Sequence, residues 1–250
     1  MQQGVSSGRS IESEQDYSRD FPLIALENSE LFNKAFNDIF DYLTNEYEGL
    51  REGARQVFYN YNYTTKLLES LKTSLVIPRV DKHLDMGRKV VIFHRRKQSG
   101  VTPPFDTILR VSENNANAIL NDKNSSPESK EKATATLLQI KEFENKFADL
   151  LEYEKTLNYD SAIDQLVQKY GDKVVFVNGD TSKKDKVNNI RNFNDDNSGI
   201  NILVVQEEAG KEGISLHDTS GLHQRVLINL SMPISSTTAL QIEGRIFRIG

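Results

Sequence analysis

The stretch Lys89-Val-Val-Ile-Phe93 decides the fold, because it is a short, continuous apolar run without the alternation of a half-exposed strand. Such runs are typical of strands that are buried on both faces of a parallel sheet. An amphipathic helical pattern follows later, with Ile163, Leu166, Val167 and Tyr170 on one side. Three further runs have the same character: Lys173-Val-Val-Phe-Val177, Asn201-Ile-Leu-Val-Val205 and Arg225-Val-Leu-Ile-Asn-Leu230. This alternation predicts an α/β fold, a parallel sheet with helices on both faces.

The segment before the first strand predicts helices. Apolar residues recur at helical spacing from Leu31 to Leu43, and further helical stretches cover about 46–60 and Thr64 to about Leu75. Residues Val80 to Met86 then end at Gly87, which indicates a helix stop. Residues 1 to about 20 are polar, and we expect them to be disordered. The chain therefore divides into a disordered start with a helical extension, 1–65, and a sheet-bearing lobe, 66–250.

The lobe contains a stretch of different character at about 98–160. It begins with Pro103-Pro104, continues with Asn-rich sequence to Asn124, and then shows a Glu/Lys-rich helical pattern from about Pro127 to Leu151. We interpret it as a mostly helical insertion.

Composition limits the classes of function. The 250 residues carry a net charge of -5 and include no cysteine, which excludes disulfides and thiolate metal sites. The four histidines are scattered, so no metal cluster is indicated. We expect no membrane partner and a cytoplasmic location, because neither a signal-peptide core nor an apolar run of 18 residues occurs. The mild acidity means that any nucleic-acid contact must come from a local basic patch.

The residues that follow the strands are the candidates for ligand contact, since ligands of open parallel sheets gather at the carboxyl ends of strands. All four loops are expected to open on one edge of the sheet. They read His94-Arg95-Arg96-Lys97, Asn178-Gly179-Asp180-Thr181-Ser182, Gln206 through Gly210 to Gly213-Ile-Ser215-Leu, and Ser231-Met-Pro233.

The last ten residues read Gln241-Ile-Glu-Gly244-Arg245-Ile-Phe-Arg248-Ile-Gly250. On a helix, Gln241, Arg245 and Arg248 share one stripe, and the isoleucines between them share a stripe that can be buried. Two guanidiniums on a fixed element suit the charge on phosphate oxygens during phosphoryl transfer, which indicates a nucleoside triphosphate. The alternative is a solvated helix face. Gly244 favours ligand or backbone approach, because glycine costs about 1 kcal/mol against alanine in a helix.

In this order, the segments resemble motifs IV to VI of superfamily two helicases, in their second RecA-like lobe. The resemblance is carried by the strand that ends in Phe-His, the Val-x-Gly-Asp-Thr-Ser loop, the Ala-Gly-x-x-Gly-Ile-Ser-Leu loop and the closing Gln-x-x-Gly-Arg-x-x-Arg. The segments Gly-Ile-Ser-Leu-His and His-Gln-Arg are most similar to strawberry notch-type helicases, with Swi/Snf-type DNA translocases as near relatives. The resemblance covers about residues 66–250 without the insertion.

The resemblance implies roles for individual residues. Arg248 would be the finger at the γ-phosphate of ATP, Arg245 its neighbour at the phosphates, and Gln241 a polar link across the cleft. The other implied contacts fall into two groups: Gly213, Ser215 and Gly244 with ATP, and Arg95, Arg96, Lys97, Thr181, Ser182 and Gly210 with nucleic acid.

Structural alternatives accompany these roles. Gly210 and Gly213 are also compatible with a turn before a helix. Thr181 and Ser182 are also compatible with a helix N-cap, with Asp185, three residues after Ser182, as a capping-box-like carboxylate. The Arg95-Arg96-Lys97 cluster is equally compatible with an exposed charge run.

The sequence departs from the family pattern in two places. Glu207 stands six residues before Gly213, where the family usually has Thr or Ser, and it adds a charge near the expected phosphates. No G-x-x-x-x-G-K-[ST] phosphate loop occurs in the 250 residues. The resemblance therefore implies the C-terminal half of an ATP-dependent DNA helicase or translocase, a fragment of a larger protein. Its N-terminal RecA-like lobe would hold Mg²⁺ and the nucleotide, and the fragment alone should be inactive.

RNA stays open as the nucleic-acid partner, because the preference for DNA comes only from the resemblance. Two other classes also stay open. One is a non-catalytic RecA-like docking module for nucleic acid or protein. The other is a Rossmann-like enzyme, which is disfavoured because no G-x-G-x-x-G follows a strand.

Overall fold

A computed structural model describes residues 20, 26–95, 100–210, 214–231 and 236–246. The predicted disorder of residues 1 to about 20 lies almost entirely outside the described residues. In chain order the elements are α1 (Ser29–Ile39), η1 (Glu48–Leu50), α2 (Arg51–Phe58), α3 (Tyr61–Asp85), β1 (Lys89–His94), α4 (Pro104–Asn121), α5 (Pro127–Lys146), α6 (Ala148–Thr156), α7 (Ala162–Tyr170), η2 (Gly171–Lys173), β2 (Val174–Val177), α8 (Lys183–Asn194), β3 (Ile202–Gln206), α9 (Glu207–Gly210), β4 (Arg225–Asn229) and α10 (Ser236–Glu243).

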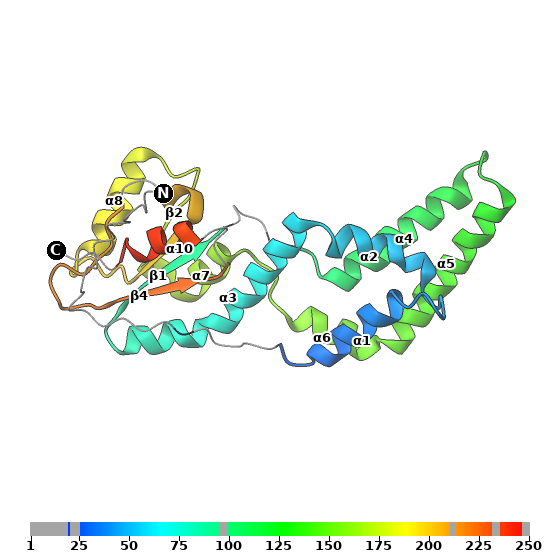
Figure 1. The fold of residues 1–250 in the computed structure, drawn as a ribbon, viewed down its shortest axis with the longest axis horizontal. Helices are drawn as coiled ribbons and strands as arrows, with labels where there is room; N and C mark the ends of the chain where they lie inside the picture. The colour runs from blue at the N-terminus through cyan, green and yellow to red at the C-terminus, as the bar shows by residue number, and fades with distance from the viewer. Residues whose placement is uncertain (1–19, 21–25, 96–99, 211–213, 232–235, 247–250) are drawn as a thin grey trace, which may run out of the picture.

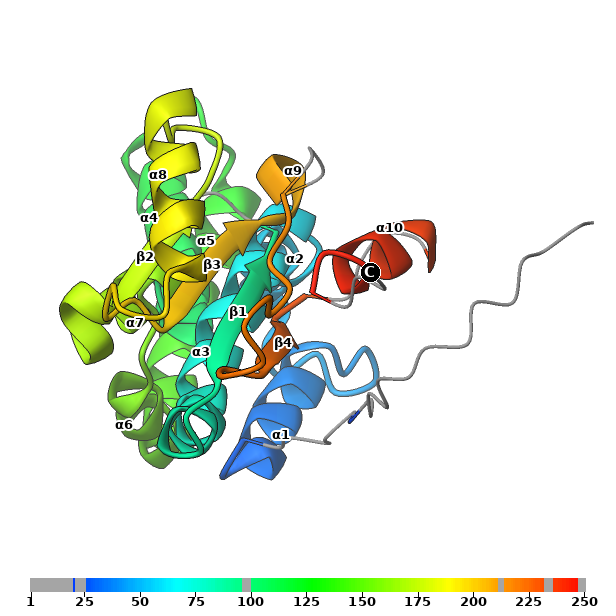
Figure 2. The same ribbon diagram turned by 90° about the vertical axis from the view of Figure 1, so that its left-hand side faces the viewer.

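The four strands form one parallel sheet in the order β2-β3-β1-β4. The first strand in the chain, β1, lies inside the sheet, where Val91 pairs with Leu203 of β3 and Leu227 of β4. The apolar runs therefore became the strands that the sequence predicted, within one residue at each end, and the α/β prediction is confirmed. Figure 2 shows the sheet between its covering helices.

Helices cover both faces of this sheet. One face packs against α3 and α7, and the other packs against α8, α10 and the loop at Ile214–Leu216. The residues of the two layers are Val76, Val80, Val90, Ile92, Ala162, Ile163, Leu166, Ile202 and Val204 on one side, and Val91, Phe93, Phe193, Leu203, Val205, Ile214, Leu216, Ile242 and Ile246 on the other.

The remaining helices form a second, separate core, which we call the helical unit (α1, η1, α2, α4, α5 and α6). Figure 1 shows it as an elongated arm beside the sheet. The extension and the insertion, far apart in the sequence, contribute jointly to this core: Ala35, Ile39, Tyr47, Leu50, Ala54, Val57, Phe105, Ile108, Leu109, Ile140, Phe143, Phe147 and Leu150. Close helix approach requires Gly53, where a Cβ would lie 2.8 Å from the Ile108 carbonyl oxygen. The two segments are thus one packed unit.

The 25-residue helix α3 joins the helical unit to the sheet (Figure 1). Its start is capped by the Asn60 side chain, which accepts hydrogen bonds from the amides of Asn62 and Tyr63. The sequence predicted two shorter helices, but α3 continues through Pro78. Pro78 has no amide hydrogen, so the helix loses one backbone hydrogen bond at this point. Burial of Val80 against the sheet compensates for this loss and favours continuation of the helix. The helix ends at Asp85, and Gly87, two residues later, provides the expected stop with a φ of 72°.

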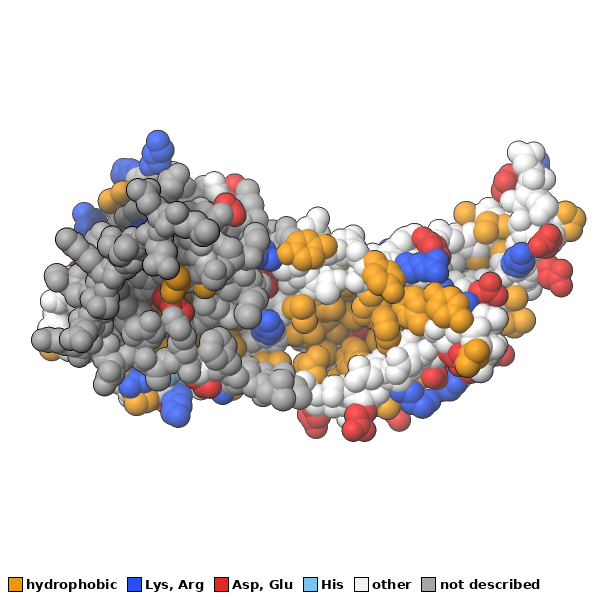
Figure 3. Space-filling view, viewed as in Figure 1, with side chains coloured by type: hydrophobic (Ala, Val, Ile, Leu, Met, Phe, Trp, Pro, Cys, Tyr) orange, Lys and Arg blue, Asp and Glu red, His pale blue; other side chains and the backbone are white. Residues whose placement is uncertain are grey.

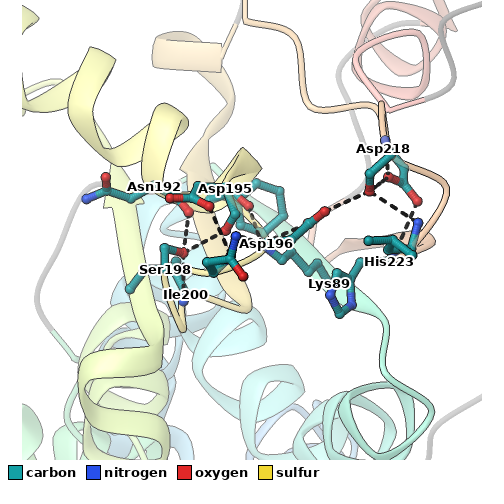
Figure 4. A network of polar contacts seen from close by, with 12 residues as sticks. Lys89, Asn192, Asp195, Asp196, Ser198, Ile200, Asp218 and His223 are labelled. Atoms are coloured by element: carbon teal, nitrogen blue, oxygen red, sulfur yellow. Dashed lines mark hydrogen bonds and ion pairs between the residues drawn. The ribbon is translucent and has the colours of Figure 1, made fainter.

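A buried polar cluster lies at the amino ends of the strands (Figure 4). The Lys89 ammonium donates to the carbonyl oxygens of Phe193 at 2.7 Å and Asp195 at 2.9 Å, and it lies 3.6 Å from a carboxylate oxygen of Asp196. Lys89 pairs in register with Arg225, which is also buried. Both cations lie over the Phe193 ring, with Lys89 Nζ at 5.6 Å and Arg225 Cζ at 5.1 Å from its centroid. The cluster ties β1 and β4 to the segment after α8.

A buried carboxyl, that of Glu154, caps the first turn of α4. It accepts hydrogen bonds from the amides of Phe105 at 3.0 Å and Asp106 at 3.3 Å. Such amides lack intrahelical partners, so a carboxylate there stabilises the helix start. Burial nevertheless raises the pKa of Glu154 to about 7, because desolvation outweighs the two amide hydrogen bonds that lower it.

Replacement of Glu154 by glutamine should change how stability depends on pH. Because the folded-state pKa is raised, the contribution of Glu154 is present below pH 4.5 and is lost as pH rises to about 7. We expect the free energy of unfolding of Glu154→Gln, relative to wild type, to rise by about 2 kcal/mol between pH 5 and pH 7. Urea unfolding at several pH values measures this. Glu152→Gln on the exposed side of α6 is the matched control, and a parallel shift in both variants would contradict the assignment.

The part of the chain that the structure describes contains no helix long and apolar enough to cross a membrane. Within the same residues, no group of three or more histidine, aspartate and glutamate side chains is arranged to hold a metal ion.

Candidate functional site

The loops after the four parallel strands meet at one edge of the sheet, as the sequence predicted, and a polar network connects three of them directly. Gln206, at the end of β3, donates to the Arg95 carbonyl oxygen at 3.4 Å and accepts from the Gly179 amide at 3.0 Å. It therefore joins the loops that follow β1 and β2. We call this region the carboxyl edge.

Helix α3 connects the remaining loop to the network through Glu69, which is only 4 % exposed. One Glu69 carboxylate oxygen accepts from the Arg95 amide at 2.7 Å and from the Ser231 hydroxyl at 2.5 Å. Lys72, one turn further along α3, donates to the Leu230 carbonyl oxygen at 3.1 Å. The loops after β1 and β4 are thus both held by α3. Glu69 was not predicted from the sequence, although a carboxylate among Leu67, Leu68 and Leu71 is a usable signal.

The Arg95 side chain points into this network rather than into solvent. Its Nε lies 3.4 Å from a carboxylate oxygen of Glu207, and one of its terminal nitrogens donates to the Tyr61 hydroxyl at 2.6 Å. Burial raises the pKa of Glu207, and the Arg95 charge opposes that rise. Glu207, the departure from the family pattern, therefore has its own cationic partner. The other two residues of the predicted basic cluster, Arg96 and Lys97, lie outside the described residues.

The capping alternative is confirmed for Ser182 but not for Thr181. The Ser182 hydroxyl accepts from the Asp185 amide at 3.1 Å and donates to the Asp185 carboxylate at 2.7 Å, which caps α8. Thr181 exchanges hydrogen bonds with Asn178 in the turn after β2. Ser182 remains exposed, so its contact with nucleic acid stays a prediction.

Gly210 has a packing reason to be glycine. A Cβ at this position would lie 2.8 Å from ring carbon Cε1 of Phe93 and 2.8 Å from Cγ1 of Val205. The backbone here therefore packs directly against two strands of the sheet. This geometry fits the alternative of a turn after the strand, and the predicted contact of Gly210 with nucleic acid is not tested by it. Gly213 lies outside the described residues.

The segment after Gly213 is attached to the arginine motif. The Leu216 amide donates to the Arg245 carbonyl oxygen at 2.8 Å, which brings Ser215 next to the arginine segment in space. Asn194 of α8 donates to the Ser215 carbonyl oxygen at 3.0 Å, and the Ser215 hydroxyl lies 2.7 Å from Nδ1 of His217. The segment at Ser215 and the segment at Arg245, which were both predicted to contact ATP, therefore lie against each other although they are separate in the sequence.

The closing helix is shorter than the sequence predicted. α10 ends at Glu243, and Gly244 to Ile246 continue as tighter turns in which Arg245 and Ile246 donate to residues three positions earlier. Glycine favours such an end because it loses more backbone entropy in a helix than other residues. Ile242 and Ile246 are buried against the sheet as expected, while Gln241 is exposed. Arg248 lies outside the described residues.

The predicted residues therefore fall into two groups. The segments of Ser215 and Arg245 lie on the face of the sheet that α8 covers, near Arg225 at the start of β4, whereas Thr181 and Ser182 follow the carboxyl end of β2.

Comparison with known proteins bears on the C-terminal part of the chain. Neither curated proteins nor solved structures gave a match to this chain. Residues 129–250 do match the family model described as the helicase conserved C-terminal domain. The matched range includes most of α5 and all of α6 in the helical unit, as well as α7, β2, β3, β4 and α10, while α3 and β1 precede it. Together with the parallel RecA-like α/β sheet, this match supports the assignment of a helicase C-terminal lobe to the chain.

Proposed function

We propose that this chain is the ATP-side C-terminal lobe of an ATP-dependent DNA helicase or translocase of superfamily two, similar to strawberry notch-type and Swi/Snf-type proteins. The observation that carries the proposal is the attachment of the Ile214–Leu216 segment to Arg245, within the range that matches the helicase C-terminal domain. A RecA-like lobe with a phosphate loop, outside these 250 residues, would hold ATP and Mg²⁺. The present lobe would close on that nucleotide.

On the ATP side, Arg245 and Arg248 would contact the phosphates, and Gln241 would link the two lobes. Guanidinium groups stabilise the charge that spreads over phosphate oxygens in the transition state, provided that they are held in place. Burial of Ile242 and Ile246 and the Leu216–Arg245 hydrogen bond provide that support. Gly213, Ser215 and Gly244 would border the nucleotide.

On the nucleic-acid side, the loops after β1 and β2 would contact the phosphate backbone through Arg96, Lys97, Thr181 and Ser182, with Gly210 and Arg95 beside them. The charge distribution supports this division. Residues 29–58 and 104–156, which span the helical unit, contain 16 Asp and Glu against 10 Lys and Arg, a net charge of −6. The rest of the chain therefore carries +1, out of a total of -5. The sheet-bearing part is the one that suits a phosphate backbone.

The 250 residues alone should hydrolyse ATP negligibly, even with DNA present, because they contain no phosphate loop. We expect turnover far below about 1 s⁻¹, the low end for typical enzymes. A coupled assay with and without single-stranded DNA measures this, and addition of a separately produced phosphate-loop lobe should raise the rate. Turnover near 1 s⁻¹ by the isolated chain would contradict the proposal.

The second candidate is a non-catalytic docking module for a protein partner. It is favoured by the surface of the helical unit, where Figure 3 shows a band of hydrophobic side chains. Leu43 is 95 % exposed, and Tyr42 and Tyr59 are also exposed. Exposed apolar patches of this kind often mark protein contacts. The two candidates differ in whether substitution of Arg245 and Arg248 changes a measurable ATPase activity.

A further inference from the structure

The Arg95–Glu207 pair occupies a defined position in the sheet. His94 pairs with Gln206 in the parallel register of β1 and β3. Arg95 and Glu207 are the residues that follow directly after these two strands. Register thus places a cation and an anion at adjacent strand ends. Their side chains meet with Nε of Arg95 3.4 Å from Oε2 of Glu207.

The pair is shielded from water. The side chains of Arg95 and Glu207 are 15 % and 4 % exposed. Among the residues that the structure describes, the charged groups that face Glu207 are Arg95 after β1, Glu69 on α3 and Glu208 on α9. Two of these three are carboxylates, so Arg95 is the cation that balances Glu207. A buried carboxylate that loses its cation is strongly disfavoured.

The pair also lies at the start of the next segment. Glu207 is the first residue of α9, and Lys186 of α8 donates to the Ala209 carbonyl oxygen at 2.8 Å further along that turn. The chain then runs to Ser215 and the Leu216–Arg245 hydrogen bond. Glu207 and the segment that lies beside the arginine motif therefore belong to the same connection between β3 and β4.

On its other side, Arg95 contacts the start of α3, the helix that joins the sheet to the helical unit. Its guanidinium donates to the hydroxyl of Tyr61, the first residue of α3, at 2.6 Å. The start of α3 packs against α2 of the helical unit, and Glu69 on the same helix holds the Arg95 amide. One arginine thus contacts both the turn after β3 and the helix that carries the arm.

We propose that Arg95 is a positioning residue, which sets the turn at Glu207 and links it through Tyr61 to α3 and the helical unit. Arg95 would then act on ATP turnover through Glu207 rather than by direct contact with nucleic acid. This inference rests on the proposed function. It also gives a reason for Glu207 at a position where related proteins usually have a hydroxyl.

The test is DNA-stimulated ATPase activity of the longest native chain that contains these residues. We expect Arg95→Met and Glu207→Gln each to lower kcat by about 10- to 100-fold, with little change in the DNA concentration for half-maximal stimulation. The double variant should be no worse than either single variant, because both remove the same pair. Tyr61→Phe should give a smaller loss. Arg88→Met, at the opposite end of β1, is the matched control and should behave as wild type.

The pH profile separates positioning from a general loss of structure. In Arg95→Met the unpaired Glu207 carboxyl is relieved by protonation, so activity relative to wild type should rise as pH falls. The double variant should lack this pH dependence. If Arg95→Met does not fold, Glu207→Gln and Tyr61→Phe, which preserve side-chain size, carry the same test.

Three results would overturn the inference. A rise in the DNA concentration for half-maximal stimulation at unchanged kcat would make Arg95 a direct nucleic-acid contact. Additive losses in the double variant would show that the two side chains act separately. Absence of DNA-stimulated ATPase activity in the wild-type chain would refute the proposed function, and the inference with it.

Discussion

Replacement of Arg248 by alanine should lower DNA-stimulated ATP turnover by about 1,000-fold, the scale of an arginine finger. Arg245→Ala should lower it by about 100-fold, as expected when one donor to a transition-state charge is removed. The Arg245 backbone would still accept the Leu216 hydrogen bond, and Ile242 and Ile246 would still be buried. The loss should therefore appear in kcat while the fold stays intact. Steady-state kinetics on the longest native chain measures it.

The matched control is Arg110→Ala, on the exposed side of α4 in the helical unit. It removes the same charge far from the carboxyl edge, and turnover should not change. Equal losses in all three variants would show that net charge, rather than position, matters. Unchanged turnover in Arg245→Ala and Arg248→Ala would favour the docking module.

Replacement of Lys89 by methionine should lower the free energy of unfolding by about 3 kcal/mol. Methionine fills a similar volume but leaves the carbonyl oxygens of Phe193 and Asp195 without their donor. It also removes the cation beside Asp196, and loss of one partner from a buried pair is strongly destabilising. Burial lowers the pKa of Lys89, and the charge of Arg225 lowers it further. The two carbonyl oxygens and the Asp196 carboxylate are therefore needed to keep Lys89 charged.

Chemical denaturation of Lys89→Met against wild type measures this effect. Lys173→Met, an exposed lysine immediately before β2, is the matched control and should change stability by less than about 0.5 kcal/mol. Equal stability of Lys89→Met and wild type would show that the buried cluster contributes no net stabilisation.

The features of the fold that depend on a local sequence pattern could be predicted from the sequence. Four apolar runs predicted four parallel strands, because only a sheet buried on both faces tolerates such runs. The helix N-cap at Ser182 followed from a local capping pattern in the same way. The convergence of the loops at one edge followed from the parallel arrangement, since carboxyl ends then share an edge.

Long-range packing could not be predicted in this way. The Asn-rich stretch of the insertion forms α4, because Phe105, Ile108 and Leu109 are buried against helices from the N-terminal extension. Asparagine is a weak helix former, so tertiary burial decided the outcome. The helical unit itself depends on pairing segments separated by about half of the chain. Nothing in a single segment specifies that pairing.

The polar connections of the site also depend on register. Arg95 was predicted to contact nucleic acid because it follows a strand, yet its partner Glu207 is defined only once β1 and β3 are aligned. Lys89 was likewise predicted only as the first residue of an apolar run, because its partners are not adjacent in the sequence. Its acceptors come from the segment after α8, about a hundred residues further along the chain.

The most direct test of the central claim is the ATPase activity of the longest native chain that contains these residues, measured with and without single-stranded DNA. A helicase or translocase lobe predicts that DNA raises turnover at least tenfold, in the range of about 1 to 1,000 s⁻¹ that is typical of enzymes. A chain that has its phosphate loop and binds ATP, yet shows no turnover with DNA or RNA, would contradict the motor function.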